Sequence, residues 1–166
     1  MFRRIIKSLI PPIITNLYYN FFAIRRKSFF NSRYIYFKNS CENIKVYGEY
    51  GCGQSTLWLL EHTSAKVISV DSSKEWINKV KNKSINYSLR LNIKYIDLGE
   101  VTSWGRPIGY EKSENFSDYT DFIWKGSVKP THVLIDGRFR VCCFLTSLKF
   151  ADPGTIIIFD DYSKRP

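Results

Sequence analysis

The sequence predicts an α/β fold in which a doubly wound, mostly parallel sheet of about five strands carries helices on both faces. Apolar, strand-like runs alternate with helical stretches between residues 44 and 159, and this alternation is typical of parallel sheets. A glycine-containing turn follows the first run, and an aspartate ends each of the other four. With 166 residues, 44% of them hydrophobic, the chain has one domain's length and enough apolar side chains for a core.

The turn at residues 49–56 is the most informative stretch. Residues 44–48 are strand-like, and a helix that runs to about His62 follows the turn. Gly51 and Gly53 lie between the two elements, where glycine allows positive φ and a close approach to a ligand. The helix N-terminus, with Ser55 or Thr56 as the expected cap, favours an anionic group.

A second strand over residues 66–70 ends on Asp71, which lies 20 residues after Gly51. Nucleotide-binding βαβ units place an acid on the ribose hydroxyls at this separation. Ser72 and Ser73 are expected to cap the following helix, over residues 74–83. The predicted apolar contacts of this helix come from Trp76, Ile77 and Val80.

The remaining elements follow in order. A third strand over residues 91–96 ends on Asp97. Residues 98–129 show no regular pattern apart from a possible helix near residues 119–124, so they are either a functional loop or a surface excursion. The last elements are a strand over residues 132–135 that ends on Asp136, a helix over 139–150, and a strand over 154–159 followed by Asp160 and Asp161. Parallel strands bring all these acids to one edge of the sheet, where ligands of such folds bind.

Positive charge is concentrated at the N-terminus. The formal net charge is +10, yet residues 1–40 alone contain eight Lys and Arg residues and no acid. The net charge of residues 41–166 is therefore only +2. We predict a basic, aromatic, helical arm over residues 1–40 and a globular domain over residues 41–166. Because the domain is nearly neutral, no nucleic-acid partner is expected.

The arm has two interpretations. Residues 8–24 are uncharged, but Pro11 and Pro12 interrupt them and they fall short of the ~20 apolar residues of a membrane span. Aromatic and basic residues together suit a helix at the surface of an anionic membrane, and a helical layer packed on the domain is the alternative. We expect a cytoplasmic protein in which residues 1–40 make peripheral contact with the membrane surface.

The four cysteines give no pattern of metal ligands. They form no Cys-x-x-Cys pair, so a zinc site is not expected. Cys142 and Cys143 fall in an apolar helical stretch and are expected to be buried thiols.

The ordered motifs of residues 44–162 resemble the class I S-adenosylmethionine-dependent methyltransferases, in an uncharacterised bacterial branch. They are Glu49-x-Gly51-x-Gly53, Val70-Asp71, Asp97, Leu134-Ile135-Asp136-Gly137 and Ile158-Phe159-Asp160-Asp161-Tyr162. The resemblance implies a Rossmann-like fold and S-adenosylmethionine as cofactor. By the resemblance, the cofactor-binding residues would be Glu49, Gly51, Cys52, Gly53, Ser55, Asp71, Ser72 and Asp97. Glu49 and the glycines would hold the methionine end, Asp71 the ribose, and Asp97 would lie near the adenine.

Two features depart from that family. Ser55 replaces the third glycine of the motif, and the sequence ends at Pro166, where the family has two further strands. The fifth strand would then be a bare apolar edge. This predicts a chain truncated after that strand, or an edge covered by another subunit or by the arm.

Asp136 is the candidate catalytic residue. With Asp160 and Asp161 it resembles the metal-binding acids of catechol-type O-methyltransferases, in which Mg²⁺ would lower the pKa of the acceptor hydroxyl. The alternative is that Asp136 caps the following helix while Asp160 and Asp161 pair with Arg138 or Arg140.

The sequence as a whole predicts an S-adenosylmethionine-dependent O-methyltransferase acting on a small molecule or glycan. A non-catalytic binding or scaffold module docked on a membrane is one alternative. An NAD-dependent oxidoreductase is the other, although Thr56 stands where its third motif glycine would be.

Overall fold

The computed structural model describes residues 34–41, 43–102 and 106–162, and the structural statements that follow concern these residues. The chain divides into two units, residues 1–38 and 39–166. Most of the predicted arm, residues 1–33, lies outside the described residues, so its helix and its membrane contact stay predictions. Within the described part, no helix has both the length and the apolar character needed to cross a membrane.

Helices and strands alternate along the second unit as predicted. In chain order the elements are α3 (Tyr34–Ser40), β1 (Val46–Tyr50), α4 (Gln54–His62), β2 (Lys66–Asp71), α5 (Lys74–Lys83), η3 (Ile85–Arg90), β3 (Leu91–Tyr95), η4 (Ser113–Asn115), α6 (Phe116–Asp121), η5 (Phe122–Trp124), β4 (His132–Ile135), α7 (Arg140–Phe150) and β5 (Ile156–Phe159).

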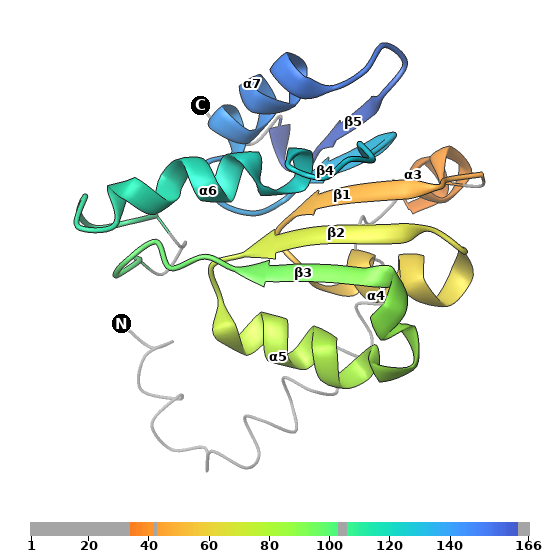
Figure 1. The fold of residues 1–166 in the computed structure, drawn as a ribbon, viewed down its shortest axis with the longest axis horizontal. Helices are drawn as coiled ribbons and strands as arrows, with labels where there is room; N and C mark the ends of the chain where they lie inside the picture. Colours follow the sequence, from red (N-terminus) through yellow and green to blue (C-terminus); the bar gives the residue numbers. More distant parts are fainter. Residues whose placement is uncertain (1–33, 42, 103–105, 163–166) are drawn as a thin grey trace, which may run out of the picture. The chain divides into compact units, whose positions relative to one another are not determined.

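The five strands form one parallel sheet in the order β3-β2-β1-β4-β5. Helices α4 and α5 cover one face and α6 and α7 the other (Figure 1). This confirms the predicted doubly wound, Rossmann-like α/β fold. Strand order reverses between β1 and β4, which pair from Tyr47 opposite His132 to Tyr50 opposite Ile135. Such a switch point, at the carboxyl ends of the strands, is where ligands bind in folds of this kind.

Apolar side chains fill both faces of the sheet. The larger cluster joins the strands to α6, η5 and α7 through residues such as Tyr50, Tyr119 and Ile135, all fully buried. The smaller cluster lies under α5, where Ile77 and Val80 pack against partly buried side chains of β3. All five residues of the central strand β1 are buried, as expected for a parallel sheet that is covered on both faces.

The segment between β3 and β4 is more ordered than its sequence suggests. The predicted helix near residues 119–124 is present, but it begins earlier, at Phe116, and continues as η5. The Tyr50 hydroxyl donates to the Thr120 carbonyl and accepts the indole N–H of Trp124 at 2.9 Å. These two hydrogen bonds attach α6 and η5 to the central strand.

Several local predictions are wrong or only partly right. Gly53 is the N-cap of α4 in place of Ser55 or Thr56, and its N–H donates to Thr56 Oγ1 at 2.9 Å. Ser73 caps α5, as predicted, by accepting the Trp76 N–H at 3.3 Å. Two apolar side chains are exposed where burial was expected. They are Trp76, which is 46% exposed and lies under the ammonium of Lys79, and Cys142.

Candidate functional site

The acids predicted at the strand ends lie along the carboxyl edge of the sheet. Asp71 is the last residue of β2, and Asp136 and Asp160 come directly after β4 and β5. The backbones of Asp136 and Asp160 continue the hydrogen-bond ladder of the sheet. The Asp136 N–H donates to the Tyr50 carbonyl at 3.0 Å, and the Asp160 N–H donates to the Ile135 carbonyl at 3.1 Å. The parallel topology therefore brings acids from separate parts of the chain to the edge that holds the glycine turn.

Glu49 lies beneath the glycine turn and not on its surface. It is fully buried in β1, and its carboxylate accepts hydrogen bonds from four hydroxyl groups. The donors are Tyr47, Ser55, Thr56 and Ser69. Burial raises the pKa of Glu49 to about 7, and the bonds from Ser55, Thr56 and Ser69 oppose the rise. Two of the donors belong to the first turn of α4, so Glu49 positions the glycine turn from inside the domain.

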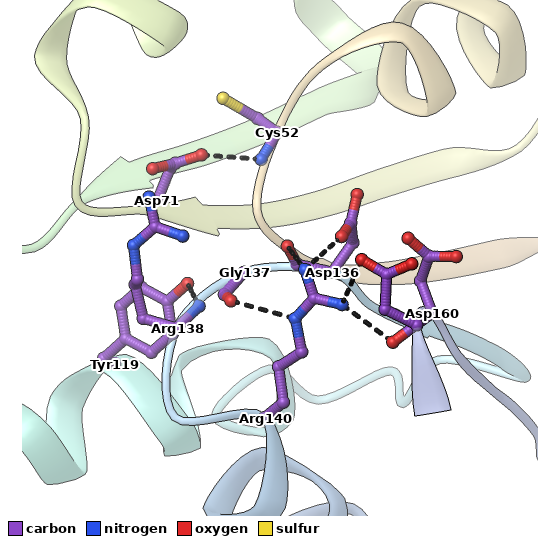
Figure 2. A network of polar contacts seen from close by, with 9 residues as sticks. Cys52, Asp71, Tyr119, Asp136, Gly137, Arg138, Arg140 and Asp160 are labelled. Carbon is purple, nitrogen blue, oxygen red and sulfur yellow. Dashed lines mark hydrogen bonds and ion pairs between the residues drawn. The ribbon is translucent and has the colours of Figure 1, made fainter. Parts of the chain in front are cut away.

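Asp71 joins the glycine turn to the end of β2. One carboxylate oxygen accepts the N–H group of Cys52 at 2.9 Å (Figure 2). The other accepts the N–H group of Ser73 at 2.8 Å. A carboxylate oxygen has two lone pairs, so each still has capacity for a ligand hydroxyl. The structure thus brings together the two predicted parts of a nucleoside site, the glycine turn and the acid.

The two motif glycines have different surroundings. At Gly51 φ is +92°, and a Cβ would lie 2.8 Å from the Cα of Gly137 in the turn after β4. Only glycine fits there, because the two turns touch through their backbones. A Cβ on Gly53 would meet nothing within 4 Å. The open side of the turn is therefore at Gly53, where a ligand has room to approach.

The other predicted cofactor residues are Ser55, Ser72 and Asp97, and their roles stay predictions. The Ser55 hydroxyl donates to Glu49, and its side chain is buried with it. Ser72 is half-buried beside Asp71. Asp97 is exposed two residues beyond β3, and its carboxylate accepts the Gly99 N–H at 3.1 Å.

Arg140 occupies the space between the acids at the ends of β4 and β5. Its guanidinium pairs with the Asp136 carboxylate and donates to the Asp136 and Asp160 carbonyls at 2.9 and 2.7 Å. Asp161 lies 3.8 Å from it. Burial and the neighbouring Asp160 raise the pKa of Asp136, and Arg140 opposes the rise.

The predicted Mg²⁺ site gains no support from this arrangement. Among the described residues, no group of three or more His, Cys, Asp or Glu side chains is placed to hold a metal ion. A guanidinium already lies against Asp136, where the cation would have to bind. The residues therefore do not fit the metal, and the pairing of acids with Arg140 corresponds to the alternative interpretation. The cap predicted by that alternative is absent, because the N-cap of α7 is Phe139.

Two residues at the turn after β4 were not predicted as site residues, Arg138 of the turn itself and Tyr119 of α6. Tyr119, from α6, is fully buried, and its hydroxyl accepts the Arg138 N–H at 3.0 Å. The Arg138 side chain extends past the Tyr119 ring toward Asp71 (Figure 2). The Asp-Gly-Arg-Phe-Arg run was the available signal, but only the fold shows which of its two arginines is already paired.

The fold and site define a Rossmann-like α/β protein with a glycine turn and an acid at the switch point. No protein-family profile matches the sequence. No curated protein matches it significantly. The chain is 30% identical to a methyltransferase-like protein from Silicibacter pomeroyi of known crystal structure. The match covers 79% of this chain and 71% of that one, with a TM-score of 0.64. The chain therefore belongs to the same family as this methyltransferase-like protein.

Proposed function

We propose that this protein is an S-adenosylmethionine-dependent methyltransferase that transfers the methyl group to an oxygen atom of a small molecule or glycan. The observation that carries the proposal is the contact between Asp71 and the glycine turn, in a chain whose relative is methyltransferase-like. A nucleoside ligand needs both parts, an acid for the ribose and a turn that admits a close approach.

The residues at the carboxyl edge fit an adenosyl ligand. The free lone pairs of Asp71 would accept the ribose hydroxyls, and the open side of Gly53 would admit the methionine part. When bound, S-adenosylmethionine supplies an activated methyl group for an in-line displacement, and the protein's task is to orient the acceptor and exclude water. Asp136, with 45% of its side chain exposed and its pKa raised, is the candidate acceptor of the hydroxyl proton.

Calorimetric titration of the purified chain with S-adenosylmethionine tests the cofactor, with NAD⁺ as the competing ligand. The informative variant is Asp71→Asn, which keeps the size of the side chain but loses the charge. Its matched control is Asp152→Asn, an exposed acid between α7 and β5. We expect the wild type and the control to bind S-adenosylmethionine alike, and Asp71→Asn to bind about tenfold more weakly or worse.

Three results would contradict the proposal, each in a different way. Binding of NAD⁺ alone would indicate an oxidoreductase. Binding of neither nucleotide would remove the cofactor site. Tight binding of S-adenosylmethionine without methyl transfer to any of a panel of hydroxyl compounds would indicate a binding module.

A further inference from the structure

Among the described residues, Arg138 of the site has no ion-pair partner for its charge. Its Nε atom is buried and has no hydrogen-bond partner, and within the described part of the chain no carboxylate forms an ion pair with it. The Arg138 side chain extends toward the Asp71 carboxylate (Figure 2), but the two form no ion pair. A buried donor of a charged group normally has an acceptor, so its absence needs an explanation.

The other arginine of this region, Arg140, is fully paired, so the lack of partners is specific to Arg138. Arg140, two residues later, uses three guanidinium nitrogens on the carbonyls of Asp136, Gly137 and Asp160 and on the Asp136 carboxylate. Arg140 therefore holds the turn together, whereas the Arg138 side chain makes no hydrogen bond or ion pair with the described residues.

The backbone around Arg138 is held in a fixed and unfavourable conformation. Phe139 has φ 51° and ψ 39°, a left-handed conformation that a bulky aromatic residue rarely adopts. Tyr119 accepts the Arg138 N–H, and Gly137 packs against Gly51. Strain of this kind persists where the surroundings enforce it, and it is concentrated at ligand sites. Its effect here is to direct Arg138 toward the glycine turn and Asp71.

We propose that Arg138 is the anion-binding residue of this site and that its guanidinium takes a carboxylate or phosphate of the bound ligand. The planar guanidinium offers several N–H donors, which suit the two oxygens of a carboxylate. The inference rests on the proposed function in one respect, since the anion belongs either to the methionine part of the cofactor or to the methyl acceptor.

Calorimetry with two adenosine ligands distinguishes an anion of the cofactor from an anion of the methyl acceptor. S-adenosylhomocysteine carries the amino-acid carboxylate, and 5′-methylthioadenosine lacks it. The variants are Arg138→Gln, which removes the charge, and Arg138→Lys, which keeps the charge but loses the planar fork. Lys66→Gln is the control, since it removes one exposed positive charge at the start of β2, the opposite end of that strand from Asp71. A second titration adds inorganic phosphate and acetate, with and without S-adenosylhomocysteine, and follows the midpoint of thermal unfolding.

If the anion is the cofactor carboxylate, Arg138→Gln binds S-adenosylhomocysteine about tenfold more weakly or worse, and its affinity for 5′-methylthioadenosine is unchanged. If the anion belongs to the acceptor, both adenosine ligands bind Arg138→Gln normally, and phosphate or acetate stabilises the wild type and the control but not the variant. The affinity of Arg138→Lys is expected to lie between those of the wild type and Arg138→Gln. The lysine variant takes the place of Arg138→Gln in the test if Arg138→Gln does not fold.

The proposal is overturned if both arginine variants match the control with all four ligands. The anion titrations also separate this proposal from the proposed function. A chain that binds neither adenosine ligand but responds to phosphate only when Arg138 is present would keep the anion site and lose the methyltransferase. A chain that responds to none of the four ligands would lose both.

Discussion

Glu49 is the residue whose chemistry the fold changes most. A carboxyl group with no exposed surface loses its hydration, and four hydroxyl donors replace only part of it. Its pKa is accordingly raised from 4.5 to about 7. The folded protein therefore binds a proton in the interval between these two values that the unfolded chain has already released.

This difference predicts a pH dependence of stability. The contribution of Glu49 is complete below pH 4.5 and is lost as the pH rises through about 7, by an amount on the order of 3 kcal/mol. Glu49→Gln does not titrate, so its free energy of unfolding should lack this fall. Urea unfolding at several pH values between 4.5 and 8 measures the free energy of unfolding of both proteins. The control is Glu75→Gln, which removes an exposed carboxylate, and equal slopes in wild type and Glu49→Gln would contradict the prediction.

The two motif glycines predict opposite results for one substitution. Gly51→Ala needs a positive φ and collides with the backbone of Gly137, so we expect a loss of about 2–4 kcal/mol in urea unfolding. Gly53→Ala meets no atom within 4 Å, and its stability should change by less than about 1 kcal/mol. Calorimetry should show that Gly53→Ala nevertheless binds S-adenosylmethionine weakly, because the methyl group enters the space of the ligand. Normal binding by Gly53→Ala would place the ligand elsewhere.

Single residues were the least predictable part from the sequence. Gly51, Gly53 and Asp71 could be chosen because their spacing is a local signal, and the structure brings the turn and the acid into contact. The unpaired state of Arg138 depends on where Tyr119, Arg140 and Asp71 lie in space, which no local pattern contains. Trp76 was predicted to pack against the sheet with Ile77 and Val80, but its side chain is exposed. Helical spacing shows which residues share a face of α5, but it does not show how far the sheet extends beneath that face.

Among the elements, α6 has the most direct effect on the site. Its Tyr119 ring packs against Phe139, with ring centroids 6.0 Å apart, and its hydroxyl accepts the Arg138 N–H. A segment for which the sequence predicted a short helix but no role thus supports the turn after β4. The strands were predictable because apolar, β-branched runs are local, whereas the support given by α6 comes from long-range packing.

Tyr119→Phe is predicted to loosen this turn without unfolding the domain. The substitution leaves the Arg138 N–H without its acceptor, at a cost of about 1–2 kcal/mol. Hydrogen exchange followed by NMR should show faster exchange at the Arg138 amide than in the wild type. Tyr110→Phe, at an exposed tyrosine of the same segment, is the control and should leave that exchange unchanged. Unchanged exchange in Tyr119→Phe would mean that the hydrogen bond does not hold the turn.

At the scale of the whole molecule, exposed apolar side chains gather at the β5 edge of the sheet, and we call this region the apolar border. β5 is the outermost strand there, and α7 exposes three aliphatic side chains at helical spacing, Val141, Leu145 and Leu148. Exposed apolar patches of this kind often mark contact surfaces. A cover for this border, by another subunit or by the N-terminal arm, stays a prediction.

Leu145→Lys combined with Leu148→Glu tests the part of that prediction that involves a second subunit. If α7 meets another copy, the double variant should elute as a monomer in size-exclusion chromatography with light scattering, while the wild type elutes as a larger species. The free energy of unfolding at low protein concentration should change by less than about 1 kcal/mol, because both side chains are exposed. A monomeric wild type would exclude the second copy as the cover.

The glycine contact between the turns after β1 and β4 also bears on how the sheet assembles. Tyr47 and His132 are paired although 85 positions separate them, so the β1–β4 pairing closes the longest loop in the sheet and is expected to form late. A slip of β4 by one residue would bring Asp136 or Arg138 against Gly51, where the structure has room only for a hydrogen atom. The two glycines would thus act as a register check during folding, rejecting every alignment of the two halves except the native one.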